Sequence, residues 1–350
     1  MNIYQCGVIN LKKIFIGAYS YIAAVIGAGF ASGQEILCYF SRYSKAGALG
    51  ILISSMIFAL FAYFIMNTCI ITKSCSYDDF MRKTIPASMI PITRVSSGIL
   101  AFAVYAVMIA AIGRLTSDIT GVPSSICAAL FAFFGTFMMY RGTYFIVRLN
   151  GVLGIILTIG ITASCMYILR YREYHVFSPV INAAASSYIY SGYNLLPLTP
   201  VLAVTGITLA KRNSAGAVSI IAGVMLTVMM FMMYIVIAIY DNKINLGEFP
   251  MLTLAYRQND ILGSIYMFLL AGAVLTTLLS SGASIIETFK LQKKLLPAAL
   301  ISSIAYSVSG AGFSTLVNTA YRICGIIGAV LITMIFICCI KSIHTNKQNS

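Results

Sequence analysis

The chain has 350 residues, of which 60% are hydrophobic and only 9% are charged, and its formal net charge is +14. A soluble domain carries about 25% charged residues. This composition, together with a mean hydropathy of +0.92, excludes an ordinary soluble protein and predicts an integral membrane protein that sits in a lipid bilayer. No stretch between the apolar runs is long enough for a globular domain, so we expect residues 1–350 to form a single transmembrane domain.

Apolar length and helix breakers divide the chain into about ten predicted spans. They cover residues 14–40, 46–72, 95–117, 123–140, 146–169, 181–206, 214–240, 261–286, 296–311 and 319–341. Between the last two, SGAGFSTLVNTAY is either a turn or the start of a longer helix, and eleven spans are the alternative. Two connections, 73–94 and 241–260, are longer than turns. The second contains FPMLTLAY, which indicates either an outer lid or an interfacial helix.

The placement of the basic residues predicts the orientation. With the N-terminus inside, fifteen of the 23 Lys and Arg residues fall in inner segments and eight in outer ones. The inner ones are Lys12, Lys13, Lys73, Arg82, Lys83, Arg94, Arg141, Arg148, Lys211, Arg212, Lys290, Lys293, Lys294, Lys341 and Lys347. We therefore expect a multi-pass protein of the cell membrane with both termini in the cytoplasm. Attraction to the anionic inner leaflet accounts for the positive charge, so no nucleic-acid partner is expected.

Motifs for catalysis and for ATP binding are missing from the sequence. The cysteines form no C-x-x-C pair, and His175 and His344 fall in a loop and in the tail. No G-x-x-x-x-G-K-[ST] phosphate-binding loop is present. We expect a protein that is not an enzyme and that takes its energy from an ion gradient if it transports a solute.

The first predicted span contains an unusual polar stretch, GAGFASGQEI, at residues 27–36. Fourteen helical residues from Ile14 to Gly27 cover about 20 Å, which reaches the middle of the bilayer. Ser32 and Glu35 have the S-x-x-E spacing of a capping box, so a second helix is expected to start there. The pattern predicts two half-helices joined by an unwound linker with free amides. Close packing of the glycines against a neighbouring helix is the alternative.

The sixth predicted span has a similar feature at its middle. Eleven residues from Ile181 cover about 16 Å, and the chain then has Tyr-Ser-Gly-Tyr-Asn at 190–194, followed by LLPLTP. Asn194 can cap a new helix, and Pro197 is tolerated in a first turn. If residues 11–172 and 180–341 are inverted repeats of five helices, both breaks fall in the opening helix of a repeat. This arrangement is typical of secondary transporters with discontinuous helices.

The GAGFASGQEI motif, the ten spans and the two predicted breaks resemble the YkvI-like bacterial membrane proteins of the amino acid/polyamine/organocation superfamily. These are similar in architecture to transporters with the LeuT fold. The resemblance implies an all-α membrane protein that holds a small-molecule substrate between its first and sixth helices. Its candidate substrate-binding residues are Gly27, Ala28, Gly29, Ser32, Glu35, Tyr105, Ser191, Gly192, Tyr193 and Asn194.

Individual members of this set have specific expected roles. The amides at Gly27, Ala28 and Gly29 would face the carboxylate of an amino acid, since helix N-termini favour anions. Glu35 is either a structural cap or a site for a ligand amine or a proton. Tyr105 either meets the ligand or packs in the core. Separately, Arg114 and Asp118 are four residues apart, and an interfacial ion pair is expected there rather than a gate.

The resemblance also implies a sodium site between the first and eighth spans. The A-x-x-[ST]-[ST] pattern occurs as Ala273-Val-Leu-Thr276-Thr277, and the matching first-span carbonyls belong to Ala23 and Ile26. Oxygen ligands suit a small hard cation. The alternative is that the threonine hydroxyls bond to carbonyls of their own helix, and a proton could take the place of sodium.

These features together predict a secondary active transporter that works by alternating access. Its substrate would be a small solute, an amino acid or a related amine, and a sodium or proton gradient would drive it. Apart from sodium, no cofactor is expected. A membrane sensor or scaffold that binds the solute without moving it is the alternative function.

Overall fold

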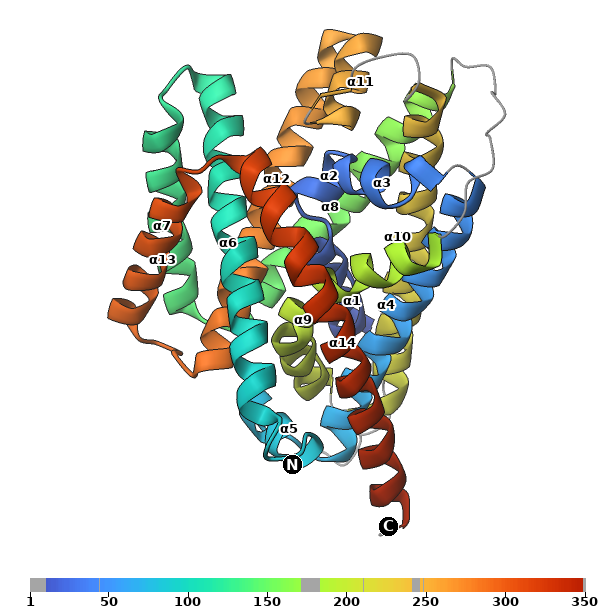
Figure 1. Cartoon of the computed structure of the whole chain (residues 1–350), viewed down its shortest axis with the longest axis vertical. Helices are drawn as coiled ribbons and strands as arrows, with labels where there is room; N and C mark the ends of the chain where they lie inside the picture. The colour runs from blue at the N-terminus through green and yellow to red at the C-terminus, as the bar shows by residue number, and fades with distance from the viewer. Residues whose placement is uncertain are drawn as a thin grey trace.

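The computed structural model describes residues 11–43, 45–170, 183–209, 211–240, 246–247 and 249–348, and every regular element within them is a helix (Figure 1). Eight of the described helices are long and apolar enough to cross a membrane. They are α4 (Lys45–Ile71), α6 (Ile90–Thr120), α7 (Ser124–Arg141), α8 (Thr143–Leu169), α9 (Ala183–Leu209), α10 (Arg212–Tyr240), α12 (Asp260–Phe289) and α14 (Phe313–Gln348). The protein is thus an all-helical membrane protein.

The other two predicted spans also correspond to helices, but shorter ones. The first span becomes α1 (Leu11–Val25), α2 (Ala28–Ala31) and α3 (Gln34–Tyr39), followed by a turn of 3₁₀ helix, η2 (Ser41–Tyr43). The ninth span is α13 (Leu295–Ser309), whose 15 residues are apolar. The chain turns at 310–312 and then enters α14, so both interpretations of SGAGFSTLVNTAY hold in part.

Two short helices lie at opposite ends of the bundle, α5 (Tyr77–Thr84) and α11 (Pro250–Gln258) (Figure 1). The sequence interpretation treated the α5 segment as a long connection, although its capping pattern is readable. Ser76 accepts a hydrogen bond from the Asp79 amide at 3.2 Å, acidic residues occupy the first turn and basic residues the last. These signals stabilise a short helix at both of its ends.

Asp78 fastens α5 to the rest of the bundle. Its carboxylate lies 2.7 Å from the Lys290 ammonium, which directly follows α12, and it also bonds to Arg94 of α6. Arg82, one turn further along α5, completes the set at 2.9 Å. Three cations on one carboxylate therefore hold α5, α6 and α12 together at the end of the bundle where α14 also finishes (Figure 1).

The predicted break in the sixth span is wrong, because α9 runs without interruption from Ala183 to Leu209. Asn194 does not cap a new helix, since its amide donates instead to the Tyr190 carbonyl one turn earlier, at 3.1 Å. Pro197 and Pro200 lie inside the helix. Proline has no backbone N–H group, so in each case the carbonyl four residues earlier loses its helical hydrogen bond. Neighbouring helices can satisfy such freed carbonyls.

One of those carbonyls has a clear replacement partner. Pro200 leaves the Leu196 carbonyl without its helical donor, and the Ser97 hydroxyl of α6 donates to it at 3.2 Å. The Ser284 hydroxyl of α12 bonds to the carbonyl of Pro197 itself. Side chains of α6 and α12 therefore support α9 where its own hydrogen bonding is incomplete, and the helix remains continuous.

The first helix lies in the centre of the bundle against α8, α9, α10 and α12. Glycines of α8 make this close approach possible: a Cβ at Gly154 would lie 2.1 Å from the Tyr19 carbonyl oxygen, and one at Gly151 would lie 2.9 Å from that of Ile16. Small residues drive such packing in membranes. Large hydrophobic side chains on the periphery, including Phe133 and Leu296, are exposed and suit a lipid environment.

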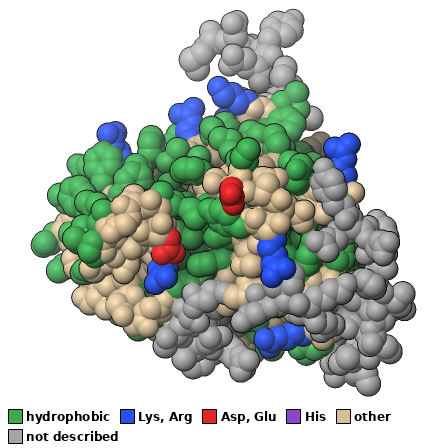
Figure 2. Space-filling view, turned by 90° about the horizontal axis from the view of Figure 1, so that it is seen from above, with side chains coloured by type: hydrophobic (Ala, Val, Ile, Leu, Met, Phe, Trp, Pro, Cys, Tyr) green, Lys and Arg blue, Asp and Glu red, His purple; other side chains and the backbone are tan. Residues whose placement is uncertain are grey.

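Seen from above, the α11 end of the bundle shows mainly hydrophobic and uncharged side chains, with Lys and Arg scattered singly among them (Figure 2). No continuous basic patch is visible among the described residues of this face. The distribution is compatible with the proposed outer side of a membrane protein, where positive charge is not concentrated.

Candidate functional site

The site is built around the interruption that follows α1. The Gly27 amide donates to the Val25 carbonyl at 2.9 Å rather than to that of Ala23, so the helical ladder stops there. The Ala23 carbonyl loses its helical donor, and the amides of Ala28 and Gly29, at the first two positions of α2, have no acceptor within that helix. Helix ends leave such groups open to other partners, and here they lie in the buried centre of the bundle.

Hydroxyl groups of α12 donate hydrogen bonds to the backbone carbonyls at the end of the first helix. Thr276 Oγ1 lies 2.9 Å from the Ala23 carbonyl oxygen, and Thr277 Oγ1 lies 3.3 Å from that of Ile26. Thr276 Oγ1 is also 2.9 Å from the Ala273 carbonyl oxygen of its own helix. The five residues expected around sodium are thus brought together, and the bond within α12 is of the kind that the alternative interpretation expected; sodium binding stays a prediction.

A further polar residue supports this contact, and the sequence interpretation missed it. Asn150 of α8 donates from Nδ2 to the Thr276 carbonyl at 3.2 Å and to the Ser280 hydroxyl at 2.7 Å. Its Oδ1 is buried without a partner among the described residues. A buried asparagine inside an otherwise apolar span was the available signal, because buried polar groups normally need partners.

The capping box predicted at Ser32 and Glu35 is wrong. Gly33 is the N-cap of α3, with φ at +83°, a left-handed conformation that favours glycine. The Ser32 hydroxyl donates to the Gly29 carbonyl at 3.1 Å and accepts from the Gln34 amide at 3.3 Å. Since the turn is completed without Glu35, the carboxylate does not cap the helix and is directed into the protein.

Glu35 is only 6% exposed and packs directly over the backbone of α2. A Cβ at Gly29 would lie 2.3 Å from its Oε1, so any larger residue there would displace the Glu35 side chain. The carboxylate faces the hydroxyl groups of Tyr193 and Tyr190, yet its Oε2 has no hydrogen-bond partner of good geometry among the described residues. No Lys or Arg in the described part of the chain forms an ion pair with it.

The two tyrosines that face this carboxylate belong to a cluster of aromatic rings. The rings of Tyr39 and Tyr190 have centroids 5.5 Å apart, and those of Tyr190 and Tyr193 pack edge to face at the same distance. Phe40 meets Tyr190 edge to face at 5.0 Å. This packing holds the hydroxyl groups of Tyr190 and Tyr193 towards Glu35.

A small enclosed cavity lies beside Glu35. It is lined by Gly27, Glu35, Tyr193, Asn194 and Thr277, together with apolar side chains of α1, α6 and α9. Its volume is about 20 Å³, which suffices for about one water molecule. The chain is therefore closed tightly around this point, and a larger molecule can enter only if the helices move apart.

Three predicted substrate-binding residues lie elsewhere. Tyr105 is buried with its hydroxyl 2.9 Å from that of Ser302 in α13, so it is a core residue and does not line the cavity. Gly192 faces α14, where a Cβ would lie 2.3 Å from the Ala329 amide nitrogen. Ser191 donates to a carbonyl of its own helix at 2.9 Å. Side-chain direction separates these residues from Tyr193 and Asn194, and position along the chain alone could not show it.

The α2–α3 turn is held from the α11 end of the bundle. The Met251 amide at the start of α11 donates to the Ser32 carbonyl at 2.8 Å, and Tyr266 of α12 donates to the Ala31 carbonyl at 2.6 Å. The first turn of α11 is buried. The start of α11 is therefore fixed to the turn between α2 and α3, and the two interpretations of FPMLTLAY, an outer lid and an interfacial helix, both stay predictions.

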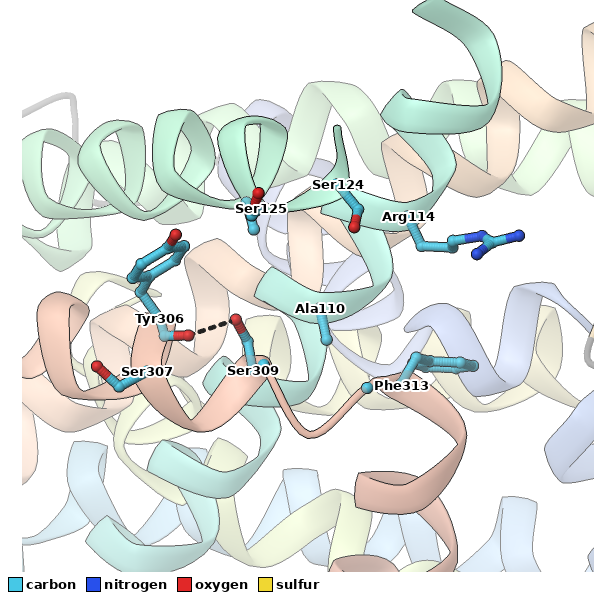
Figure 3. A pocket seen from close by; sticks show the side chains of 11 residues that line it. Ala110, Arg114, Ser124, Ser125, Tyr306, Ser307, Ser309 and Phe313 are labelled. Atoms are coloured by element: carbon cyan, nitrogen blue, oxygen red, sulfur yellow. Dashed lines mark hydrogen bonds between the residues drawn. The ribbon is translucent and has the colours of Figure 1, made fainter. Parts of the chain in front are cut away.

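A larger cavity, of about 580 Å³, lies away from the interruption, between α6, α7, α13 and the start of α14 (Figure 3). The Ser309 hydroxyl donates to the Tyr306 carbonyl at 2.7 Å, and Arg114 extends away from these groups. The predicted ion pair of Arg114 with Asp118 is confirmed, at 3.2 Å and in an exposed position. The polar groups of this cavity are thus largely engaged with their own helices.

The chain matches no protein-family model. It is 23% identical over 329 residues to the uncharacterized membrane protein YkvI of Bacillus subtilis strain 168, which covers 90% of this chain and 93% of YkvI. The chain is a homologue of YkvI. The fold of this YkvI homologue is shared with solved transporters.

Two solved structures show that fold. A manganese transporter of Eremococcus coleocola superposes with a TM-score of 0.60 at 15% identity, covering 91% of this chain and 74% of the transporter. Mhp1, a nucleobase-cation-symport-1 family transporter solved in a closed conformation with bromovinylhydantoin bound, gives 0.59 at 13% identity, covering 89% and 74%. The YkvI homologue therefore has a LeuT-like transporter fold.

Proposed function

We propose that this protein is a secondary active transporter that binds one small solute beside the interruption between α1 and α2. The observation that carries the proposal is the meeting of the freed α1 carbonyls with Thr276 and Thr277, next to a cavity that contains the lone carboxylate Glu35. Alternating access would expose this cavity to each side of the membrane in turn.

The order of the helices supports two inverted repeats. Counting α1 to α3 as one span, five spans run from α1 to the end of α8 and five from α9 to α14. A short helix follows the second long span in each half, namely α5 and α11, and these two lie at opposite ends of the bundle (Figure 1). Inverted repeats place equivalent elements on opposite sides of the membrane.

The charge at the site favours a substrate with an amine. Glu35 lies over Gly29 and beside the open amides of α2, so it already provides a negative group where a substrate carboxylate was expected. A second carboxylate next to an ionised Glu35 would be repelled, whereas an ammonium group would find a counter-charge there. The proposed substrate is an amino acid or related amine whose amino group faces Glu35.

Sodium is the proposed coupling ion. Carbonyls of Ala23, Ile26 and Ala273 and hydroxyls of Thr276 and Thr277 are all oxygen donors, and the two hydroxyls already lie within hydrogen-bond distance of these carbonyls. Small rotations of the two hydroxyls would turn their lone pairs towards an ion. A proton carried by Glu35 is the second candidate, because one of its oxygens has no partner of good geometry.

The solved relatives raise manganese and hydantoin-like compounds as further substrates to test. The cavity of this chain offers one carboxylate, the Asn194 amide and the hydroxyl-bearing residues Tyr193, Thr277 and Ser281. In the described part of the chain no three His, Cys, Asp or Glu side chains gather as a metal site would need. This donor set favours an organic amine over a transition-metal ion.

Purified protein in liposomes tests the proposal. Uptake of labelled amino acids and amines is measured under a sodium gradient, a proton gradient or neither, with manganese and hydantoin as comparison substrates. We expect accumulation of one amine-bearing solute that a sodium gradient drives and that Glu35→Gln abolishes. Binding with no flux under any gradient would refute transport and support the sensor function.

A further inference from the structure

A second polar cavity, of about 300 Å³, lies at the α5 end of the bundle, between α1, α8 and the end of α9. Lys12, Lys13 and Arg148 line it, together with Tyr144 and Thr208. The transport site does not use these residues, since they lie at the start of α1 and of α8, far along the chain from the interruption at Gly27. We call this cavity the basic pocket.

Two of the three charges of the basic pocket, Lys12 and Arg148, have no ion-pair partner among the described residues. No described carboxylate lies within 4 Å of Lys12 or Arg148. Lys13 donates to the Thr208 carbonyl at 3.4 Å, and the Arg148 guanidinium carbon lies over the Tyr144 ring, 5.3 Å from its centroid. Guanidinium and ammonium groups that converge in one cavity favour an anion with several oxygens, above all a phosphate.

Apolar surface continues from the basic pocket along both helices. Leu11 and Phe15 are exposed one turn apart on α1. On α8, Val152 and Ile156 are exposed at successive steps of four residues after Arg148, so they lie on the same helix face. A soluble phosphate would use only the pocket, whereas a phospholipid would use the pocket and this apolar face together.

We propose that the basic pocket binds the phosphate headgroup of an anionic phospholipid, whose acyl chains lie along the exposed faces of α1 and α8. Basic pockets between transmembrane helices on the cytoplasmic side are suited to such headgroups, and the proposed orientation places this end in the cytoplasm. The lipid would connect the start of α1 with α8. Lipid binding itself does not depend on the proposed transport function.

The test is a thermal-stability titration of the full-length protein in detergent with dioleoylphosphatidylglycerol. Dioleoylphosphatidylcholine has the same chains without net charge, and glycerol phosphate carries the phosphate without chains. The Lys12→Gln/Arg148→Gln variant removes two charges from the pocket. The control Lys293→Gln/Lys294→Gln removes two exposed basic side chains elsewhere in the predicted inner segments.

We expect the anionic lipid alone to raise the melting temperature to a plateau, with an apparent affinity about fivefold weaker for each pocket charge removed, hence roughly 25-fold weaker in the double variant. The control variant should bind like the unmodified protein. Equal stabilisation by phosphatidylcholine would refute recognition of the headgroup charge by the basic pocket. Equal potency of glycerol phosphate would refute a contribution of the acyl chains. Equal weakening in both variants would show that general surface charge is responsible. The single variants Lys12→Gln and Arg148→Gln cover the case in which the double variant does not fold.

Discussion

Replacing Gly29 by alanine tests the packing of Glu35 on α2. The added Cβ would lie 2.3 Å from Glu35 Oε1, 2.7 Å from its Cγ and 2.8 Å from its Cδ. Favourable contacts between heavy atoms begin at about 3.5 Å, so the Glu35 side chain or the α2 backbone must move by roughly 1 Å. Overpacking of this kind costs about 1–3 kcal/mol. We expect Gly29→Ala to lower the free energy of unfolding by that amount.

The matched control is Gly216→Ala in α10, where the nearest atom to a new Cβ is 3.9 Å away. Alanine there should be neutral or raise the free energy of unfolding by up to about 1 kcal/mol, because alanine has a higher helix propensity than glycine. Unfolding can be followed by helical circular dichroism as dodecyl sulfate is added to mixed micelles. A double-mutant cycle with Glu35→Ala separates the contact from other effects. The reasoning is refuted if Gly29→Ala costs the same with and without the Glu35 side chain.

Three further results are expected. Thr276→Val removes a buried hydroxyl and should lower the free energy of unfolding by about 1–3 kcal/mol. It should also abolish the rise in melting temperature in sodium relative to potassium. Thr276→Ser should retain the stability and the sodium-dependent rise. Tyr105→Phe loses its bond to Ser302, which should cost about 0.5–1.5 kcal/mol without changing solute affinity; a loss of affinity would return Tyr105 to the binding site. Burial opposes ionisation of Asp78, but the hydrogen bond and charge of Lys290 and the two neighbouring arginines bring its pKa below 3.8. Its contribution to stability should be full above that value and should disappear as the pH falls through the lowered pKa, and a melting series in Asp78→Asn should lack this acid-dependent step.

The pairing of α1 with α12 was accessible from the sequence because a known pattern located it. Ala23, Ile26, Thr276 and Thr277 were chosen because the resemblance to LeuT-fold transporters implied them, and the structure brings all four together. Asn150 had no such pattern. Its role depends on the position of α8 against α12, which is a matter of packing between segments more than 100 residues apart.

Other parts of the site depended on competing local interactions that the sequence does not rank. Both Ser32 with Glu35 and Asn194 match the composition of helix caps. In the structure Gly33 caps α3, and the Asn194 amide bonds within its own helix. Several polar groups can satisfy the same backbone atom, and the choice among them is made by the tertiary surroundings.

The sequence by itself determined the membrane environment, the order of the long helices and an interruption of the first span at its glycines, because apolar length and helix-breaking glycines act locally along the chain. The extent of the predicted unwound linker was wrong, since only residues 26–27 lie outside a helix and Ala28–Ala31 form α2. Only the tertiary structure decided which side chains meet at the interruption. Glu35 points inward because Gly29 leaves space for it, and Tyr105 points away because Ser302 lies on the other side of α6. Direction around a helix axis is set by the packing of neighbouring helices, and that information is distributed over the whole chain.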